Sequence, residues 1–220
     1  MLSNVALAGT VVHDGVSPAA AVAIAGEDVW VSIAVGPKVV LHFHTDGTFV
    51  ASVPLAAASL ALTALEGTAY GITNSGEVIA LDAATNVESK LASLPMGGIV
   101  NATIAASGSD LWADTTELIH VDLATKQVTD STPAVIYSLA ADPHEPGRAW
   151  AAPFETDPQL VPGPGNGEVV RLSLHGVGHD GSLHFDTISM QGVNRLVIAP
   201  DGTVYGESAY TTTVYRISLS

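Results

Sequence analysis

An aromatic residue recurs along this chain at intervals of about forty residues, each time just after a polar turn. The five positions are Trp30, Tyr70, Trp112, Trp150 and Tyr205. The steps between them are 40, 42, 38 and 55 residues, and the last is longer because residues 153–167 look like an insertion. A period of this length is the signature of a fold built from repeated supersecondary units. It therefore constrains the architecture more than any other feature.

Short apolar runs rich in β-branched residues surround each aromatic position. In the first unit one run precedes Trp30 at residues 22–24, and another follows it at residues 39–43. Turn signals such as Asp46-Gly47 separate the runs, which is typical of strands in an antiparallel sheet. A fourth predicted strand continues four of the units, at residues 49–53, 87–94, 127–132 and 183–189.

The fifth unit ends directly after its third strand, whereas residues 4–12 form a strand-like run that belongs to no unit. Pairing of this run with residues 213–218 would close a ring and leave no open sheet edge at the seam. We therefore expect an all-β chain, a single five-bladed β-propeller of four-stranded antiparallel blades whose last blade is closed by the N-terminal strand. The expected blades are residues 17–54, 55–95, 99–133, 134–190, and 191–220 together with 3–13. A truncated larger propeller is the alternative.

Composition narrows the classes of function. Hydrophobic residues make up 47% of the chain and charged residues 13%, which fits one packed domain without long tails. Seven basic residues against 22 acidic ones give a formal net charge of −15, which disfavours nucleic acid and anionic membranes as partners. The absence of cysteine excludes disulfides and thiolate ligands. No apolar run approaches ~18 residues, and the start Met-Leu-Ser-Asn does not resemble a signal peptide, so we expect neither membrane insertion nor that export route.

Three segments carry a resemblance to known repeats. Residues 77–87 (Glu-Val-Ile-Ala-Leu-Asp-Ala-Ala-Thr-Asn-Val) and 117–128 resemble the blade repeat of streptogramin-lyase-like, NHL and quinoprotein-like propellers. Residues 199–208 look most like a streptogramin-lyase-type repeat. Many unrelated functions share such blades. The resemblance implies a metal with catalytic His and Glu near the channel; Glu207 lies where the repeat has an acid, but no His occupies an equivalent position in a neighbouring blade. The signatures of WD40 repeats are absent.

The insertion is the main departure from the repeat, and loops held by a rigid scaffold often carry binding residues. Its prolines stiffen it, and its apolar side chains suit contact with a partner, although a lid over the channel mouth is the alternative. The candidate binding residues are Phe154, Glu155, Asp157 and Leu160 in the insertion, with Asn74 and Tyr210 in other loops.

Eight histidines raise the question of a metal site. His42 and His44 alternate on one predicted strand and so share a face. His42 and His120 occupy the same position of the repeat, which in the other units holds Ala80, Arg171 and Arg216. A position that accepts such different side chains is typical of a half-exposed site on a blade, so we do not expect these histidines to form a ligand set.

Other residues are candidates for chemistry. His175, His179 and His184 lie close in sequence and are weak metal-ligand candidates, because they fall around a glycine-rich hairpin loop. Asp114 and Glu207 are weak catalytic candidates, since paired carboxylates at the mouth of a channel can act as acid and base. We expect these acids on or near solvated loops of one face.

The sequence favours a non-catalytic module for recognition or assembly. We expect it to bind a protein or a glycan through loops on one face, as in a component of a phage tail or virion, and we expect no cofactor. The alternative is a metal-dependent lyase or glycoside hydrolase acting at the channel mouth. The compartment is left open between virion and cytoplasm.

Overall fold

The computed structural model is built from β-strands throughout the part of the chain that it describes. That part comprises residues 19–33, 36–94, 102–133, 136–142, 147–153, 169–174, 183–188, 193–199, 201, 203–208 and 214–217. The expected closing strand at residues 3–13 lies outside these residues and stays a prediction. In the described part there is no helix with the length and apolar character needed to cross a membrane.

The described strands form five antiparallel sheets, and each strand pairs with the next one along the chain. The first sheet contains β1 (Ala19–Ala25), β2 (Asp28–Ile33), β3 (Val39–His44) and β4 (Phe49–Pro54). The second contains β5 (Ser59–Leu65), β6 (Thr68–Thr73), β7 (Glu77–Asp82) and β8 (Glu88–Ser93). The third contains β9 (Thr103–Ser107), β10 (Asp110–Asp114), β11 (Glu117–Asp122) and β12 (Gln127–Pro133).

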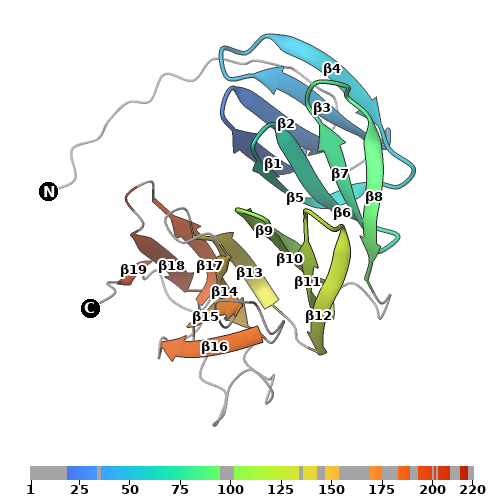
Figure 1. Cartoon of the computed structure of the whole chain (residues 1–220). Helices are drawn as coiled ribbons and strands as arrows, with labels where there is room; N and C mark the ends of the chain where they lie inside the picture. The colour runs from blue at the N-terminus through green and yellow to red at the C-terminus, as the bar shows by residue number, and fades with distance from the viewer. Residues whose placement is uncertain are drawn as a thin grey trace, which may run out of the picture.

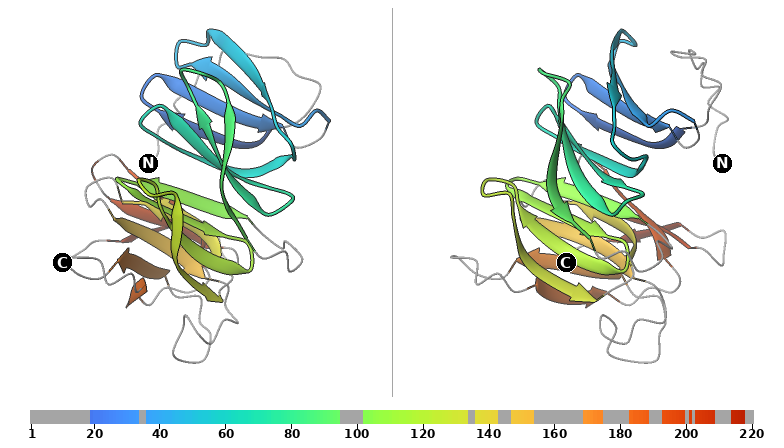
Figure 2. Two further views of the ribbon diagram at one scale, coloured as in Figure 1. Left: turned by 45° about the vertical axis from the view of Figure 1, so that its right-hand side comes forward. Right: turned by 90° about the vertical axis from the view of Figure 1, so that its right-hand side faces the viewer.

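The last two sheets follow the same order. The fourth contains β13 (Ile136–Ala141), β14 (Arg148–Pro153), β15 (Val169–Leu174) and β16 (Leu183–Ile188). The fifth contains β17 (Val193–Ile198), β18 (Val204–Ser208) and β19 (Val214–Ile217). The predicted four-strand repeat is thus confirmed in four sheets, and every periodic aromatic lies on the second strand of its sheet. Figure 1 shows the sheets following one another from β1–β4 to β17–β19, and Figure 2 shows the same succession in two further views.

The periodic tryptophans of the first, third and fourth sheets pack each of these sheets against the next one. Trp30 is fully buried in a cluster with Ile79 and Leu81 of the second sheet. Trp112 is buried in the same way against Ile136 and Leu139 of the fourth sheet. An indole ring of this size removes a large apolar area from water, so these residues supply much of the contact energy between sheets. The period in the sequence is therefore the period of the inter-sheet packing.

The first strands of the sheets pack in succession, β1 on β5, β5 on β9, β9 on β13 and β13 on β17. In the described residues no comparable packing joins β17 to β1. The described sheets therefore form a series with two uncovered end faces. On the first sheet Val22 and Ile24 are 55% and 61% exposed, and on the fifth sheet Val197 and Val214 are 64% and 66% exposed.

Candidate functional site

Histidine and aspartate side chains meet at the end of the first sheet where the β1–β2 and β3–β4 turns lie together. The Thr45 N–H donates to the Glu27 carbonyl at 2.8 Å and joins the two turns. Directly beneath them, Nε2 of His42 lies 2.8 Å from Oδ1 of Asp28. The second and third sheets join their turns in the same way, through the Ala83 N–H to the Gly67 carbonyl and the Leu123 N–H to the Ser109 carbonyl. We call this end of the sheets the histidine end, because His42 and its counterpart His120 lie near it.

The expectation that His42 and His120 are half-exposed is wrong, since their exposed fractions are 1% and 2%. The reason is that each imidazole lies against the tryptophan opposite it on the neighbouring strand. The His42 ring stacks on Trp30 with centroids 4.0 Å apart and planes inclined by 6°. Burial is tolerated because a carboxylate beside the ring satisfies its polar atom.

The third sheet repeats this arrangement with the same residue types. Nε2 of His120 lies 2.8 Å from Oδ1 of Asp110, and Trp112 is the cross-strand neighbour of His120. The rings of Trp112 and His120 are less closely stacked, with centroids 5.6 Å apart and planes inclined by 48°. Nδ1 of His120 hydrogen-bonds to the hydroxyl of Thr129. Both imidazoles thus use Nε2 toward a carboxylate and Nδ1 toward another oxygen.

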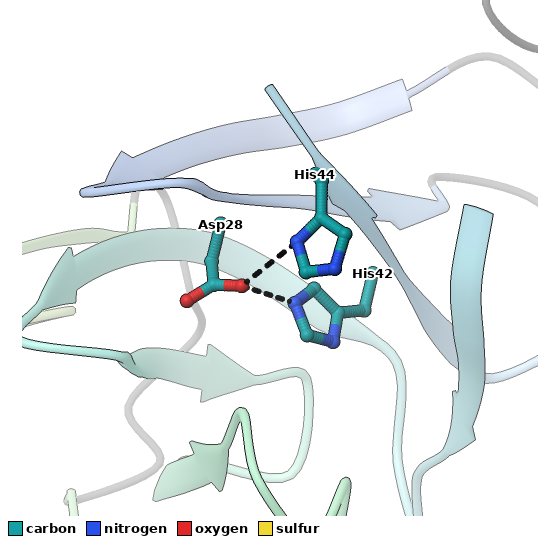
Figure 3. A group of neighbouring side chains, drawn as sticks. All are labelled: Asp28, His42 and His44. Atoms are coloured by element: carbon teal, nitrogen blue, oxygen red, sulfur yellow. Dashed lines mark hydrogen bonds and ion pairs between the residues drawn. The ribbon is translucent and has the colours of Figure 1, made fainter. Parts of the chain in front are cut away.

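The two sheets differ at the residue opposite the aspartate. In the third sheet this residue is Asp122, whose Oδ1 accepts the Thr125 N–H at 2.8 Å within the β11–β12 turn. That backbone hydrogen bond lowers the pKa of the Asp122 carboxyl. In the first sheet the equivalent residue is His44, and its Nδ1 lies 3.5 Å from Oδ1 of Asp28. Figure 3 shows both imidazoles of β3 directed toward the same carboxylate oxygen.

A different carboxylate holds the β3–β4 turn of the first sheet. Asp46 accepts the Thr48 N–H at 2.8 Å, and this hydrogen bond lowers the pKa of the Asp46 carboxyl. The turn therefore does not need an acid at position 44, and His44 is available for other contacts.

The second sheet also contributes to this group. The β7–β8 turn places Asn86 in a left-handed conformation with φ 54°, which asparagine adopts more readily than most residues. Oδ1 of Asn86 lies 2.8 Å from Nδ1 of His42. Among the described residues, Asp28, His42 and His44 are the only group of three histidine or acidic side chains close enough to share a metal ion. Sequence reasoning had paired His42 with His44 but had found neither Asp28 nor Asn86.

The two weak catalytic candidates do not come together. Asp114 is the last residue of β10 in the third sheet and so lies near a loop, as expected, but its side chain is fully buried and the expectation that it is solvated is wrong. Its Oδ1 accepts the Ile136 N–H of the fourth sheet at 3.1 Å, which joins the two sheets. Glu207 lies on β18 of the fifth sheet with an exposed side chain, and its Oε2 is 3.9 Å from Nη1 of Arg195. Because Asp114 is buried in the third sheet and Glu207 is exposed on the fifth, the two carboxylates do not suit an acid–base pair.

The remaining candidates are tested only in part. Asn74 is exposed in the β6–β7 turn, and its N–H donates to the Ala58 carbonyl at 2.8 Å. It therefore lies at the end of the sheet opposite the histidine end. His184 lies on β16, where it pairs with Ser173. Phe154, Glu155, Asp157, Leu160, His175, His179 and Tyr210 lie outside the described residues, and their expected roles stay predictions.

Comparison with known proteins identifies the fold without a family. No family model matches the chain, and no curated protein matches its sequence. Among solved structures, the WD40 repeats of RRP9 match at 13% identity with a TM-score of 0.64, over 86% of this chain and 60% of that one. The β-propeller domain of Myceliophteria thermophila Cps50 (Swd1) matches at 13% identity with a TM-score of 0.66, over 90% and 69%. Hydrazine synthase of Kuenenia stuttgartiensis matches at 13% identity with a TM-score of 0.65, over 90% and 64%.

These likenesses show that the chain has a β-propeller fold. They also show that it spans only about two thirds of the length of those chains. WD40 propellers match although the chain lacks their sequence signatures, because the shape of a four-stranded blade depends on strand pattern and packing. The finer resemblance to streptogramin-lyase-like, NHL and quinoprotein-like blades stays a prediction, as does the number of blades in a complete ring.

Proposed function

We propose that this chain is a recognition or assembly module that binds a protein partner through the uncovered face of its fifth sheet. We call this surface the open face. It consists of Arg195, Val197, Tyr205, Glu207, Val214 and Arg216, all of which are exposed. The register of β17, β18 and β19 places these side chains on one side of the sheet.

The observation that carries the proposal is the contrast between this face and the corresponding faces of the earlier sheets. Trp30, Trp112 and Trp150 are each fully buried against the sheet that follows. Tyr205 holds the same position in the repeat, yet it is 39% exposed, and Val197 beside it is 64% exposed. Apolar side chains that a neighbouring sheet would normally cover mark a surface that another molecule can cover.

The charges on the open face indicate the chemistry of the partner. Two of the seven basic residues of this acidic chain, Arg195 and Arg216, lie among the exposed valines. Arginine and tyrosine are enriched where interfaces carry most of their binding energy. A partner that presents an apolar patch bordered by aspartate or glutamate would complement both features. The overall charge of −15 opposes self-association of the whole chain, which favours a different protein over a second copy.

Closure of a five-bladed ring is the competing use of the same surface. In that ring the open face would pack against the uncovered face of the first sheet, where Ile24 is exposed. Because the chain has no cysteine, the variant Ile24→Cys/Val197→Cys tests closure cleanly. Rapid formation of an intrachain disulfide in the purified monomer would overturn docking of a partner on this face.

The docking itself is tested with Val214→Asp, and Val87→Asp serves as the control because Val87 is 59% exposed in the β7–β8 turn of the second sheet. A protein recovered with the tagged wild type and with Val87→Asp should be lost with Val214→Asp. Once that protein is purified, its affinity for Val214→Asp should be at least about tenfold lower, as expected for a charge placed in an apolar contact. Equal affinity for the two variants, or recovery of a second copy of this chain alone, would overturn the proposal.

The predicted loop surface and a glycan ligand form a finer version of this proposal. The insertion at residues 153–167 would then add contacts beside the sheet faces, as in a host-recognition component of a virion. Glycan arrays probed with the wild type and with Phe154→Ala would test it, and binding that survives the substitution would count against the insertion.

A further inference from the structure

The group formed by Asp28, His42 and His44 has the composition of a transition-metal site. Two imidazole nitrogens and one carboxylate oxygen lie within 4.8 Å of one another. Imidazole and carboxylate are the ligands that bind zinc and related divalent ions in cysteine-free sites. The group lies at the histidine end of the first sheet, whereas the open face belongs to the fifth sheet.

The three donor atoms are close enough together to share one ion. A tetrahedral zinc with ligand bonds of about 2.0 to 2.1 Å holds its donors about 3.3 Å apart. Oδ1 of Asp28 lies 2.8 Å from Nε2 of His42 and 3.5 Å from Nδ1 of His44. These distances lie on either side of the required value. The third pair, the two imidazole nitrogens, lies within 4.8 Å, and movement of the less buried side chains, Asp28 and His44, would bring all three distances to the required value.

Two contacts hold His42 in the orientation of a ligand. The stacked Trp30 ring fixes the plane of the imidazole. Oδ1 of Asn86 lies 2.8 Å from Nδ1 and can accept its proton, which leaves the lone pair of Nε2 directed at Asp28 and His44. Metal-bound histidines usually donate their other ring N–H to such an acceptor, and the acceptor sets the tautomer. Without an ion, the other tautomer can donate its Nε2 proton to Oδ1 of Asp28 at 2.8 Å, with the Asn86 amide turned so that its NH2 faces Nδ1.

An ion can also reach the site from solvent. The side chain of His44 is 46% exposed and that of Asp28 is 19% exposed, so the entry lies beside these two residues. The net charge of −15 raises the local concentration of cations around the chain. Three protein ligands leave one coordination position for water, as in open zinc sites.

We propose that Oδ1 of Asp28, Nε2 of His42 and Nδ1 of His44 bind one divalent transition-metal ion such as Zn²⁺, with Asn86 as the residue that orients His42. The fourth position is held by water. This site is independent of the open face, and neither depends on the other.

The experiment uses the full chain after treatment with a chelator, with Zn²⁺ and Co²⁺ as probes. Calorimetry should show one Zn²⁺ per chain, and Co²⁺ should give the visible absorption of a four-coordinate site. His44→Ala should lower the affinity for Zn²⁺ more than tenfold, and Asn86→Gly should lower it about 10- to 100-fold. Glycine is chosen at position 86 because it tolerates the left-handed φ of 54°.

Two variants of the third sheet serve as controls. Lys126 has φ 58° in the turn equivalent to that of Asn86, and Asp122 occupies the position equivalent to His44. Lys126→Gly and Asp122→Asn should leave the affinity for Zn²⁺ unchanged within about twofold, while circular dichroism confirms that all variants are folded. Absence of Zn²⁺ binding in the wild type would overturn the proposal. So would zinc binding that is as tight in His44→Ala as in the controls, because that result would place the ion on other residues.

Discussion

The first and third sheets share one arrangement of tryptophan, histidine and aspartate but use it differently. In both sheets a buried imidazole lies beside a buried indole and 2.8 Å from a carboxylate. In the third sheet the surroundings complete a closed contact, because the Asp110 side chain is 9% exposed and Asp122 is occupied by its own turn. In the first sheet the carboxylate is more accessible and a second imidazole faces it. The comparison shows how one repeat can carry a structural contact in one blade and a candidate binding site in another.

The two sheets differ because a different residue accepts the hydrogen bond that holds the turn. The segment Asp122-Leu123-Ala124-Thr125 uses its first residue to accept the Thr125 N–H. The β3–β4 turn instead uses Asp46, two residues later than position 44. Once another residue holds the turn, the side chain at position 44 no longer has a local hydrogen bond to make. The change to histidine therefore costs the first sheet little local stability.

The largest expected effect is loss of the tryptophans that both arrangements depend on. Trp30→Ala and Trp112→Ala should each lower the free energy of unfolding by about 3 to 5 kcal/mol, because each removes a fully buried indole between two sheets. Urea denaturation monitored by circular dichroism measures this. Trp30→Ala should also weaken Zn²⁺ binding, whereas Trp112→Ala should not. A loss below about 1 kcal/mol for either variant would show that the tryptophan does not carry the inter-sheet contact.

Substitution of the aspartate in each sheet should show the difference between the two sheets more clearly, as unequal losses of unfolding free energy. Asp110→Ala leaves Nε2 of the 2% exposed His120 without its acceptor, and should cost about 2 to 3 kcal/mol. Asp28→Ala should cost only about 1 kcal/mol, because the exposed side of that group lets water replace the carboxylate. Both are measured by urea denaturation in the presence of a chelator. Equal losses would mean that the two contacts are equally closed to solvent.

A substitution in the third sheet can test whether position 44 is the deciding residue. Asp122→His places a second imidazole opposite Asp110, and the Thr129 hydroxyl already orients His120 through Nδ1. We expect the number of Co²⁺ ions bound per chain to rise from one to two, with a small loss of stability because the turn hydrogen bond is removed. Titration followed by visible absorption measures the stoichiometry. A single ion in this variant would indicate that the openness of Asp28 matters as much as the second imidazole.

The repeat made the fold predictable, because the features that set it are local. The spacing of Trp30, Tyr70 and Trp112 follows from the number of residues in four strands and their turns, and those strands were found where the sequence placed them. The predicted closure of the ring by residues 3–13 depends on contacts between residues far apart in the chain, and it stays a prediction because those residues lie outside the described part.

Less of the candidate site could be predicted from the sequence. The position shared by His42 and His120 was judged by the variety of residues in the repeat, and burial reversed that judgement because tryptophan and aspartate lie beside both rings. A local signal did exist, in that Asp28 and Asp110 each stand two residues before a tryptophan. Asn86 could not have been found in this way, because it reaches His42 across the boundary between two sheets.

The smallest expected effect concerns the turn carboxylates that the first sheet has replaced. Asp82 and Asp122 accept the N–H groups of Thr85 and Thr125 at 2.8 Å, and these hydrogen bonds lower the pKa of both carboxyls below the ordinary value of 3.8. A pKa that is lower in the folded than in the unfolded chain adds stability that is complete above pH 3.8 and is lost as the pH falls through the folded value.

We therefore expect Asp82→Asn/Asp122→Asn to flatten the acid limb of a plot of unfolding free energy against pH while leaving its slope near neutral pH unchanged. Urea denaturation at a series of pH values measures both slopes. An acid limb as steep as that of the wild type would show that these turns do not depend on ionised carboxylates. The replacement of such an acid by His44 in the first sheet would then need another explanation.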